Sequence, residues 1–282
     1  MATVHANGVE LKVNRYCLVP DDHAGEAGEA GEAGEAGDRA DRQPRPVLVF
    51  VHGLGFVDHS GLSFTLGMPL ATVADCVLYA LRGHGRSQFV ASGYRLADHV
   101  ADLVALIDAL GIATPVHLVG CSYGGAVASF AAARHPERVG SLFLVDPVLP
   151  IPGWTELVGA KLEKAVARMR DGLTMDEAMA ALEEWSERKA AAATARARRI
   201  LLETSLVDDV RTDATLTDAD WGRMAGPVTA VFGDASEMYP QAATLQRLVP
   251  AATVHVIPEA DHLRVFAHTR EILAHIRQHL GR

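Results

Sequence analysis

The stretch that decides the fold is VHLVGCSYGG at residues 116–125, followed by AVASFAAA at residues 126–133. Its apolar first half predicts a short buried strand, its glycines permit a sharp turn, and the small residues that follow suit a helix packed closely on a sheet. In this setting the pattern G-x-S-x-G exposes a serine at a strained elbow. We therefore predict that Ser122 is a nucleophile; the alternative is an ordinary glycine turn in which Ser122 caps the helix.

Length and composition indicate one large domain. The chain has 282 residues, of which 49% are hydrophobic, enough to bury a large α/β core that carries an insertion. Its net charge of -9 argues against a nucleic-acid partner, because binding to phosphates needs clustered Lys and Arg. Part of that charge comes from a Gly-Glu-Ala repeat within residues 20–46, which we predict to be a disordered acidic surface loop because it has no large apolar side chains.

Signals for secretion, membrane insertion and metal binding are missing from the sequence. Its start is neither a signal peptide nor a lipidation signal, and no stretch stays apolar for the roughly eighteen residues of a membrane span. We expect a soluble cytoplasmic protein without membrane contact. Cys17, Cys76 and Cys121 are widely spaced and suggest neither disulfides nor a zinc site. No metal-ligand spacing, phosphate loop or dinucleotide fingerprint occurs, so neither a metal nor a cofactor is expected.

The rest of the chain alternates strand and helix patterns. A hairpin is predicted around Asn7 and Gly8, which favour a tight reversal between two β-rich runs. The later predicted strands cover residues 47–51, 76–80, the apolar run that begins at Val116, 142–145, 227–232 and 253–257, and the predicted core helices cover 96–110, the segment from the elbow to Pro136, and about 265–280. This alternation predicts an α/β fold with a mostly parallel sheet and helices on both faces.

Residues 148–221 interrupt that alternation. Amphipathic helical patterns replace the strands, one beginning at Trp154, a second opened by a capping box at Thr174, and a third over about 190–206. We predict a helical cap over 148–221 that divides the core into residues 1–147 and 222–282. The large apolar side chains of the cap are candidates for an acyl-binding pocket, although they suit a cap core equally well: Trp154, Met175, Met179 and Trp185.

Residues with candidate roles in catalysis stand at or soon after the ends of the predicted strands. One strand is followed by His52, Gly53 and Leu54, and four others are followed by Ser122, by Asp146, by Asp234 or Glu237, and by His262. Because the carboxyl ends of parallel strands meet at one edge of a sheet, these residues are expected to converge. A serine nucleophile needs a base within hydrogen-bond reach, and the base needs an acid that holds its tautomer. The chain order of serine, acid and histidine fits this requirement.

On these motifs the chain resembles serine members of the α/β-hydrolase superfamily, over nearly its whole length outside the acidic loop and the cap. The matching motifs are GCSYG at 120–124 for the nucleophile elbow, HGL at 52–54 for the oxyanion loop, RGHGRS at 82–87 for the R-G-x-G-x-S stretch, and His262 after the last strand. The resemblance implies that Ser122 attacks an acyl carbonyl and that His262 takes its proton. It also implies that the backbone N–H groups of Leu54 and Tyr123 bind the oxyanion.

The sequence departs from the commoner family pattern at the acid. That pattern places Asp three residues after the glycine that ends the penultimate strand, but three residues after Gly233 stands Ser236. Members that resemble haloalkane dehalogenases, and the thioesterase domains of megasynthases, place the acid after the strand that follows the elbow helix, where this chain has Asp146. We predict Asp146 as the acid, with Asp234 and Glu237 as alternatives; Asp146 could instead be only a turn residue.

The predicted function is a serine hydrolase that cleaves an ester or thioester through an acyl-enzyme on Ser122. A second hypothesis keeps the acyl-enzyme but passes the acyl group to an internal hydroxyl or amine, which would make the protein a transferase or cyclase. A third hypothesis is a member of the fold that does not acylate: a ligand-binding protein, or a cofactor-free lyase or oxygenase. The expected partner is a small-molecule acyl substrate; a substrate bound to a carrier protein is compatible with the sequence, but no feature supports it.

Overall fold

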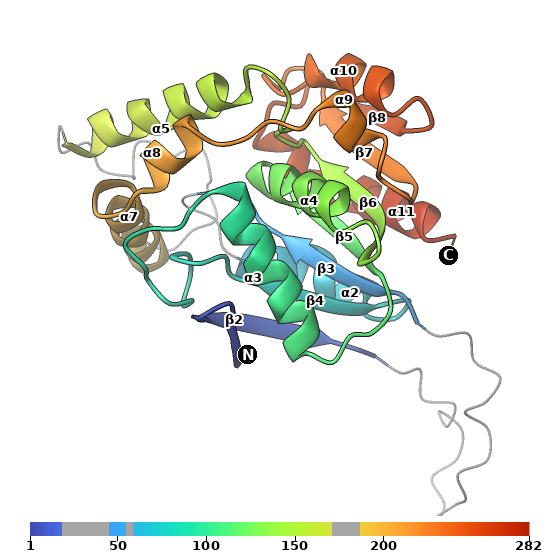
Figure 1. Cartoon of the computed structure of the whole chain (residues 1–282), viewed down its shortest axis with the longest axis horizontal. Coiled ribbons are helices and arrows are strands. Elements are labelled where there is room, and N and C mark those ends of the chain that lie inside the picture. Colours follow the sequence, from blue (N-terminus) through green and yellow to red (C-terminus); the bar gives the residue numbers. More distant parts are fainter. Residues whose placement is uncertain (19–44, 55–58, 171–186, 282) are drawn as a thin grey trace, which may run out of the picture.

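One mixed sheet forms the centre of the molecule. The computed structural model describes residues 1–18, 45–54, 59–170 and 187–281, and in these residues eight strands pair in the order β1-β2-β4-β3-β5-β6-β7-β8 (Figure 1). They are β1 (Ala2–Ala6), β2 (Val9–Tyr16), β3 (Val47–Val51), β4 (Asp75–Tyr79), β5 (Val116–Cys121), β6 (Val139–Val145), β7 (Val228–Gly233) and β8 (Thr253–Ile257). Strand β2 pairs antiparallel with β1 and β4, and the other pairs are parallel. The predicted α/β fold with a mostly parallel sheet is confirmed.

The N-terminal hairpin turns at Asn7 and Gly8, as predicted. Both residues have positive φ angles, 48° and 74°, a conformation that Asn and Gly adopt at low cost. The side chain of Asn7 also donates from Nδ2 to Asp102 Oδ1 at 2.9 Å. The turn therefore ties the hairpin to helix α3 (Leu96–Ala109), which carries Asp102.

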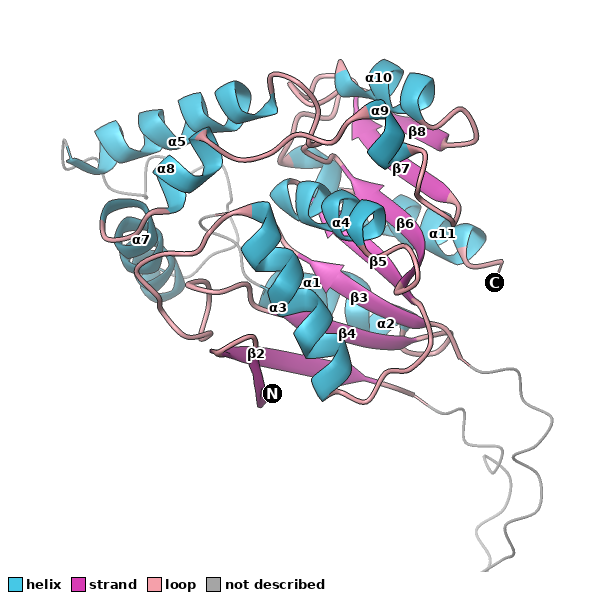
Figure 2. Cartoon of the chain, viewed as in Figure 1, coloured by secondary structure: helices cyan, strands magenta, loops and turns pink. Residues whose placement is uncertain are grey.

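Helices cover both faces of the sheet (Figure 2). One face is covered by α3, α4 (Tyr123–Arg134) and α10 (Gln241–Leu248), and the other by α1 (His59–Leu62), the π-helix η1 (Ser63–Gly67), α2 (Met68–Leu70) and α11 (Thr269–His279). Successive residues of β3 point to opposite faces of the sheet. Val49 packs in the core on the side of α3, α4 and α10, and Phe50 packs in the core on the other side. The sequence pattern does not predict the helices over 59–70 and 241–248, because such short segments have no sustained apolar period.

Helices α5 (Trp154–Arg170), α7 (Glu187–Leu202), α8 (Leu206–Arg211) and α9 (Asp218–Trp221) are inserted between β6 and β7. Figure 1 shows α5, α7 and α8 together at one side of the sheet. The helix predicted over about 190–206 is present as α7, but it ends at Leu202, and the N–H of Ser205 donates to Ala91 O of the core at 2.8 Å. The helix predicted from Thr174 lies outside the described residues, and the cap boundaries stay a prediction.

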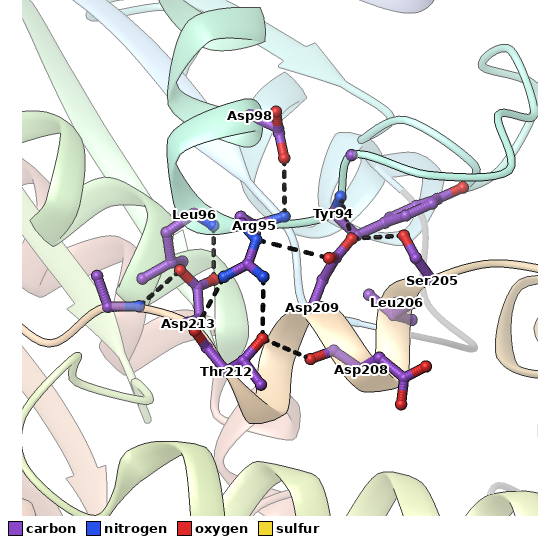
Figure 3. A network of polar contacts seen from close by, with 12 residues as sticks. Tyr94, Arg95, Leu96, Asp98, Ser205, Leu206, Asp208, Asp209, Thr212 and Asp213 are labelled. Atoms are coloured by element: carbon purple, nitrogen blue, oxygen red, sulfur yellow. Dashed lines mark hydrogen bonds and ion pairs between the residues drawn. The ribbon is translucent and has the colours of Figure 1, made fainter.

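Helix α8 and the residues just after it accept hydrogen bonds from main-chain amides at the start of α3 (Figure 3). Asp209 Oδ2 accepts from the backbone N–H of Tyr94 at 2.9 Å, and Asp213 Oδ2 accepts from that of Leu96 at 2.7 Å. Arg95 adds an ion pair, with its Nε 3.6 Å from Asp209 Oδ1. Carboxylates at this position also match the positive end of the α3 dipole. The inserted segment is therefore held at the N-terminus of a core helix.

The C-terminal helix is shorter than predicted. The sequence predicts a helix over 265–280, but the structure has a 3-10 helix, η2 (Arg264–Ala267), followed by α11. The break lies at His268, whose φ of -80° and ψ of 44° are not helical. The ring of His268 instead lies over the first turn of α11, with Nδ1 3.0 Å from Glu271 Oε1.

The other end of α11 is bound to the sheet by a histidine. His279 Nδ1 lies 2.8 Å from Thr229 Oγ1, and its Nε2 lies 2.7 Å from Ser141 Oγ. His117 Nδ1 lies 2.7 Å from the same serine oxygen. Burial, with a smaller contribution from the nearby His117, lowers the pKa of His279 from 6.5 to about 4. The neutral ring of His279 therefore anchors α11.

We expect acid to destabilise the fold, because the pKa of His279 is lower in the folded chain than in the unfolded one. Below a pH of about 6.5 the unfolded chain binds a proton at His279 that the folded chain binds only near pH 4, so the free energy of unfolding decreases as the pH falls through this window. Melting temperatures measured at several pH values in this window should fall more steeply for the wild type than for His279→Gln. His5→Gln, at an exposed position, should keep the wild-type slope; equal slopes for His279→Gln and wild type would contradict the assignment.

Candidate active site

Ser122 lies at a sharp turn between β5 and α4. Its backbone angles are φ 53° and ψ -123°, a region that residues with a Cβ seldom adopt. A Cβ on Gly124 would lie 2.0 Å from the carbonyl oxygen of Val51, and one on Gly120 would lie 2.7 Å from that of Gly124, so both positions need glycine. The carbonyl oxygen of Ser122 closes the turn by accepting from the N–H of Gly125 at 2.8 Å. The predicted strand, elbow and helix are confirmed.

Three side chains from three strand ends form one hydrogen-bonded chain. Ser122 Oγ lies 2.9 Å from His262 Nε2, and His262 Nδ1 lies 2.5 Å from Asp146 Oδ2. Because an ionised carboxylate can only accept, His262 carries its proton on Nδ1, and Nε2 accepts from the serine hydroxyl. A nucleophile, a base and an acid at these distances meet the geometric requirement for an activated serine.

Asp146 is buried at the end of β6 and held by several donors. Its exposed fraction is 0%, and its φ of 40° turns the chain sharply away from the strand. Oδ1 accepts from the backbone N–H of Gly233 at 3.1 Å, while Oδ2 accepts from the hydroxyl of Ser236 at 2.5 Å as well as from His262. Donors to both oxygens compensate for the hydration that burial removes from the carboxylate.

The two alternative acids are engaged elsewhere. Asp234 is exposed, and its Oδ1 accepts from the backbone N–H of Glu259 at 2.6 Å. Glu237 is also exposed and forms an ion pair with Lys161 of α5. Of the three carboxylates that the sequence offers, the structure brings Asp146 to the histidine.

The loop after β3 packs against the serine. A Cβ on Gly53 would lie 3.1 Å from Ser122 Cβ. The ring of His52 shapes the loop, because its Nδ1 lies 2.7 Å from Gly53 O and its Nε2 accepts a backbone N–H from the segment after β4 at 3.0 Å. Leu54 follows directly and is half-buried, and Tyr123 begins α4, where backbone N–H groups have no partner inside the helix. Both amides expected to bind the oxyanion therefore belong to segments that adjoin Ser122.

The stretch RGHGRS at 82–87 contributes a buried ion pair. Arg82 donates twice to Asp102 of α3, from Nε to Oδ2 at 2.7 Å and from Nη2 to Oδ1 at 2.5 Å. His84 Nδ1 lies 2.9 Å from Arg82 O, and its ring meets that of His52 edge-on with centroids 5.2 Å apart. The sequence motifs do not point to Asp102, although an acidic residue beside the apolar stripe of a predicted helix is a signal for a buried partner.

The residues on either side of Ser122 are less suited to react. Cys121 is 3% exposed, and burial raises the pKa of its thiol to about 12. Burial also raises the pKa of the Tyr123 hydroxyl well above its usual value of 10. At neutral pH both groups stay protonated, so Ser122 is the nucleophile of the elbow that has a base beside it.

Of the four residues expected to line an acyl pocket, the structure describes Trp154. Its side chain is 1% exposed, its ring lies 6.2 Å from that of Tyr123, and its indole N–H donates to Ala214 O at 3.0 Å. These contacts hold α5 against Tyr123, the residue that follows Ser122. Contact between Trp154 and the substrate stays a prediction. Met175, Met179 and Trp185 lie outside the described residues.

In the described segments, no group of three or more His, Cys, Asp or Glu side chains is placed to hold a metal ion. Within the same segments, no helix has both the length and the apolar character that crossing a bilayer demands.

Comparisons with known proteins place the chain in a family. Residues 46–269 match the family with the alpha/beta hydrolase fold. A pimeloyl-[acyl-carrier protein] methyl ester esterase of Chromobacterium violaceum is 30% identical over 255 residues, covering 83% of this chain and 94% of that enzyme. A haloalkane dehalogenase of Bradyrhizobium diazoefficiens is 35% identical over 115 residues, which span 40% of this chain and 36% of that enzyme.

Solved structures agree on the fold. A thermophilic esterase of Thermogutta terrifontis shares 18% identity and a TM-score of 0.72, covering 99% of this chain and 97% of that protein. This likeness agrees with the family match over residues 46–269 on the fold. The chain belongs to the α/β-hydrolase family of enzymes.

Proposed function

We propose that the protein is a serine hydrolase that cleaves a small-molecule ester or thioester through an acyl-enzyme on Ser122. The observation that carries the proposal is the unbroken hydrogen-bonded chain from Ser122 Oγ through His262 to the buried Asp146. An ester is favoured because one relative, 30% identical and covering 83% of this chain, is a methyl ester esterase by name. Dehalogenation is disfavoured, because that chemistry needs a carboxylate at the position of Ser122.

In the first half of the reaction, Ser122 Oγ attacks the acyl carbonyl carbon while His262 Nε2 accepts the hydroxyl proton. The imidazolium that results is stabilised by the Asp146 carboxylate, which receives its Nδ1–H. The carbonyl oxygen becomes an oxyanion, which the backbone N–H groups of Leu54 and Tyr123 bind, at about 3 kcal/mol for each donor. Collapse of the tetrahedral intermediate breaks the bond to the alcohol or thiol, and His262 returns its proton to the leaving group.

The second half repeats these steps with water. His262 Nε2 accepts a proton from the water as its oxygen attacks the acyl-serine carbonyl, and the same two amides bind the second oxyanion. When this intermediate collapses, the bond to Ser122 Oγ breaks, the serine regains its proton and the carboxylic acid leaves. All the proton transfers use one histidine, so its fixed orientation between Ser122 and Asp146 matters at every stage.

Covalent labelling tests the proposal. A fluorophosphonate forms one stable adduct with an activated serine, so intact mass should show one added label on the wild type and none on a folded Ser122→Ala variant. Cys121→Ala is the matched control, because it removes the adjacent side chain of the same elbow and should still be labelled. A folded wild type that takes no label would leave a ligand-binding or non-acylating role as the better explanation.

A further inference from the structure

The loop after β7 brings a serine to the place where the commoner family pattern has its acid. Ser236 stands three residues after Gly233, and its Oγ lies 2.5 Å from Asp146 Oδ2. The same carboxylate oxygen lies 2.5 Å from His262 Nδ1. Ser236 is 4% exposed and Asp146 is 0% exposed, so water does not compete for these bonds.

The hydroxyl of Ser236 is fixed as a donor to Asp146. Its oxygen accepts from the backbone N–H of Met238 at 3.1 Å, and an ionised carboxylate offers no proton in return. The backbone of Ser236 is also held, because its N–H donates to Gly233 O at 3.1 Å. The position of the serine is thus set by main-chain bonds of its own loop, and the serine in turn sets the position of Oδ2.

We propose that Ser236 is a positioning residue of the triad, which aims the Asp146 carboxylate at His262; this rests on the proposed serine-hydrolase function. Gly233 N–H holds only Oδ1, so without the serine the carboxylate could turn about its last torsion and misalign Oδ2. In the commoner pattern this position carries the acid itself. In this chain β6 supplies the charge through Asp146, and the loop after β7 supplies the placement through Ser236.

Ser236→Ala removes the donor while keeping the backbone bonds of the loop. We expect kcat for a p-nitrophenyl ester to fall about 10- to 100-fold, the effect of losing one hydrogen bond to a charged group. KM should stay within about twofold, because Ser236 acts through Asp146 and not on the substrate. The rate of fluorophosphonate labelling should fall with kcat, and Ser236→Thr, which keeps a hydroxyl, should recover most of the loss.

Ser129→Ala is the matched control. Ser129 is also fully buried, and within the described residues its hydroxyl has no hydrogen-bond partner, so its removal should leave kcat and the labelling rate unchanged. Wild-type kcat in Ser236→Ala, with or without a lower melting temperature, would overturn the positioning role. A loss that Ser236→Thr does not reduce would overturn it as well.

An exchange of the two residues gives a sharper test. Asp146→Ser alone should lose about four orders of magnitude in kcat. In Asp146→Ser/Ser236→Asp, the carboxylate extends from position 236 toward His262, and we expect at least tenfold recovery over the single variant. A double variant that melts like the wild type yet is as inactive as Asp146→Ser would overturn the inference; if it does not fold, the kinetics of Ser236→Ala decide.

The two proposals fail in different ways. If the fluorophosphonate does not label wild-type Ser122, the proposed function fails whatever Ser236→Ala does. If the wild type is labelled at Ser122 and Ser236→Ala behaves like Ser129→Ala, only the positioning role fails.

Discussion

Ser122→Ala is expected to lower kcat for p-nitrophenyl butyrate by about five to six orders of magnitude. Without the hydroxyl there is no oxygen to form the acyl-enzyme, and His262 has no proton to accept at the elbow. The oxyanion amides remain, so a small residual rate above that of buffer should persist. Initial rates measured at high enzyme concentration, with the buffer rate subtracted, give the ratio.

The variant must be shown to fold, because Ser122 occupies a strained turn. Its circular dichroism spectrum and melting temperature should match those of the wild type, since alanine fits the same backbone position. Cys121→Ala should retain activity within about tenfold. If Ser122→Ala kept more than about one hundredth of the wild-type rate, the acyl-enzyme would not be the route of hydrolysis.

Asp146→Asn is expected to lower kcat by about four orders of magnitude. The asparagine can turn its NH2 group toward His262, which favours the wrong tautomer and takes away the charge that stabilises the imidazolium. The volume hardly changes, and the bond from Gly233 N–H to Oδ1 can remain, so the fold should survive. Steady-state kinetics on the same ester, together with a melting curve, separate this loss of activity from unfolding.

The two exposed acids of the next loop provide the control. Asp234→Asn and Glu237→Gln should each keep kcat within about threefold, because Asp234 binds the N–H of Glu259 and Glu237 pairs with Lys161. The opposite ranking, with Asp234→Asn or Glu237→Gln inactive and Asp146→Asn active, would show that the acid had been assigned to the wrong strand end.

Much of the site can be predicted from the sequence, because its residues stand at or soon after the ends of strands. Apolar runs identify β3, β5 and β8, and the parallel arrangement brings their carboxyl ends together, so His52, Ser122 and His262 can be expected at one edge before any coordinates are known. The acid is harder to predict, because Asp146 follows one strand and Asp234 and Glu237 follow the next. The preference for Asp146 rests on the resemblance to members of the fold that place the acid after the strand following the elbow helix, and on Ser236 standing where the commoner pattern has its acid.

Other features depend on contacts that no local pattern contains. The roles of Ser236 and Asp102 are set by partners 90 and 20 residues away along the chain. The helix predicted over about 190–206 ends early, at Leu202, and Ser205 then bonds to a core loop; the one predicted over about 265–280 is interrupted at His268. Thr204, Ser205 and His268 are weak helix formers, so local propensity also favours an interruption at both places.

Two hydrogen bonds that attach α8 to α3 join a side chain on one element to a main-chain group on the other. Asp209 and Asp213 contribute side-chain carboxylates, whereas Tyr94 and Leu96 contribute main-chain amides. Any residue except proline carries such an amide, so these two bonds do not depend on which side chains stand at positions 94 and 96, while the other side needs a carboxylate at both 209 and 213. These two bonds therefore restrict the sequence on one side only, at the two aspartates that follow α7.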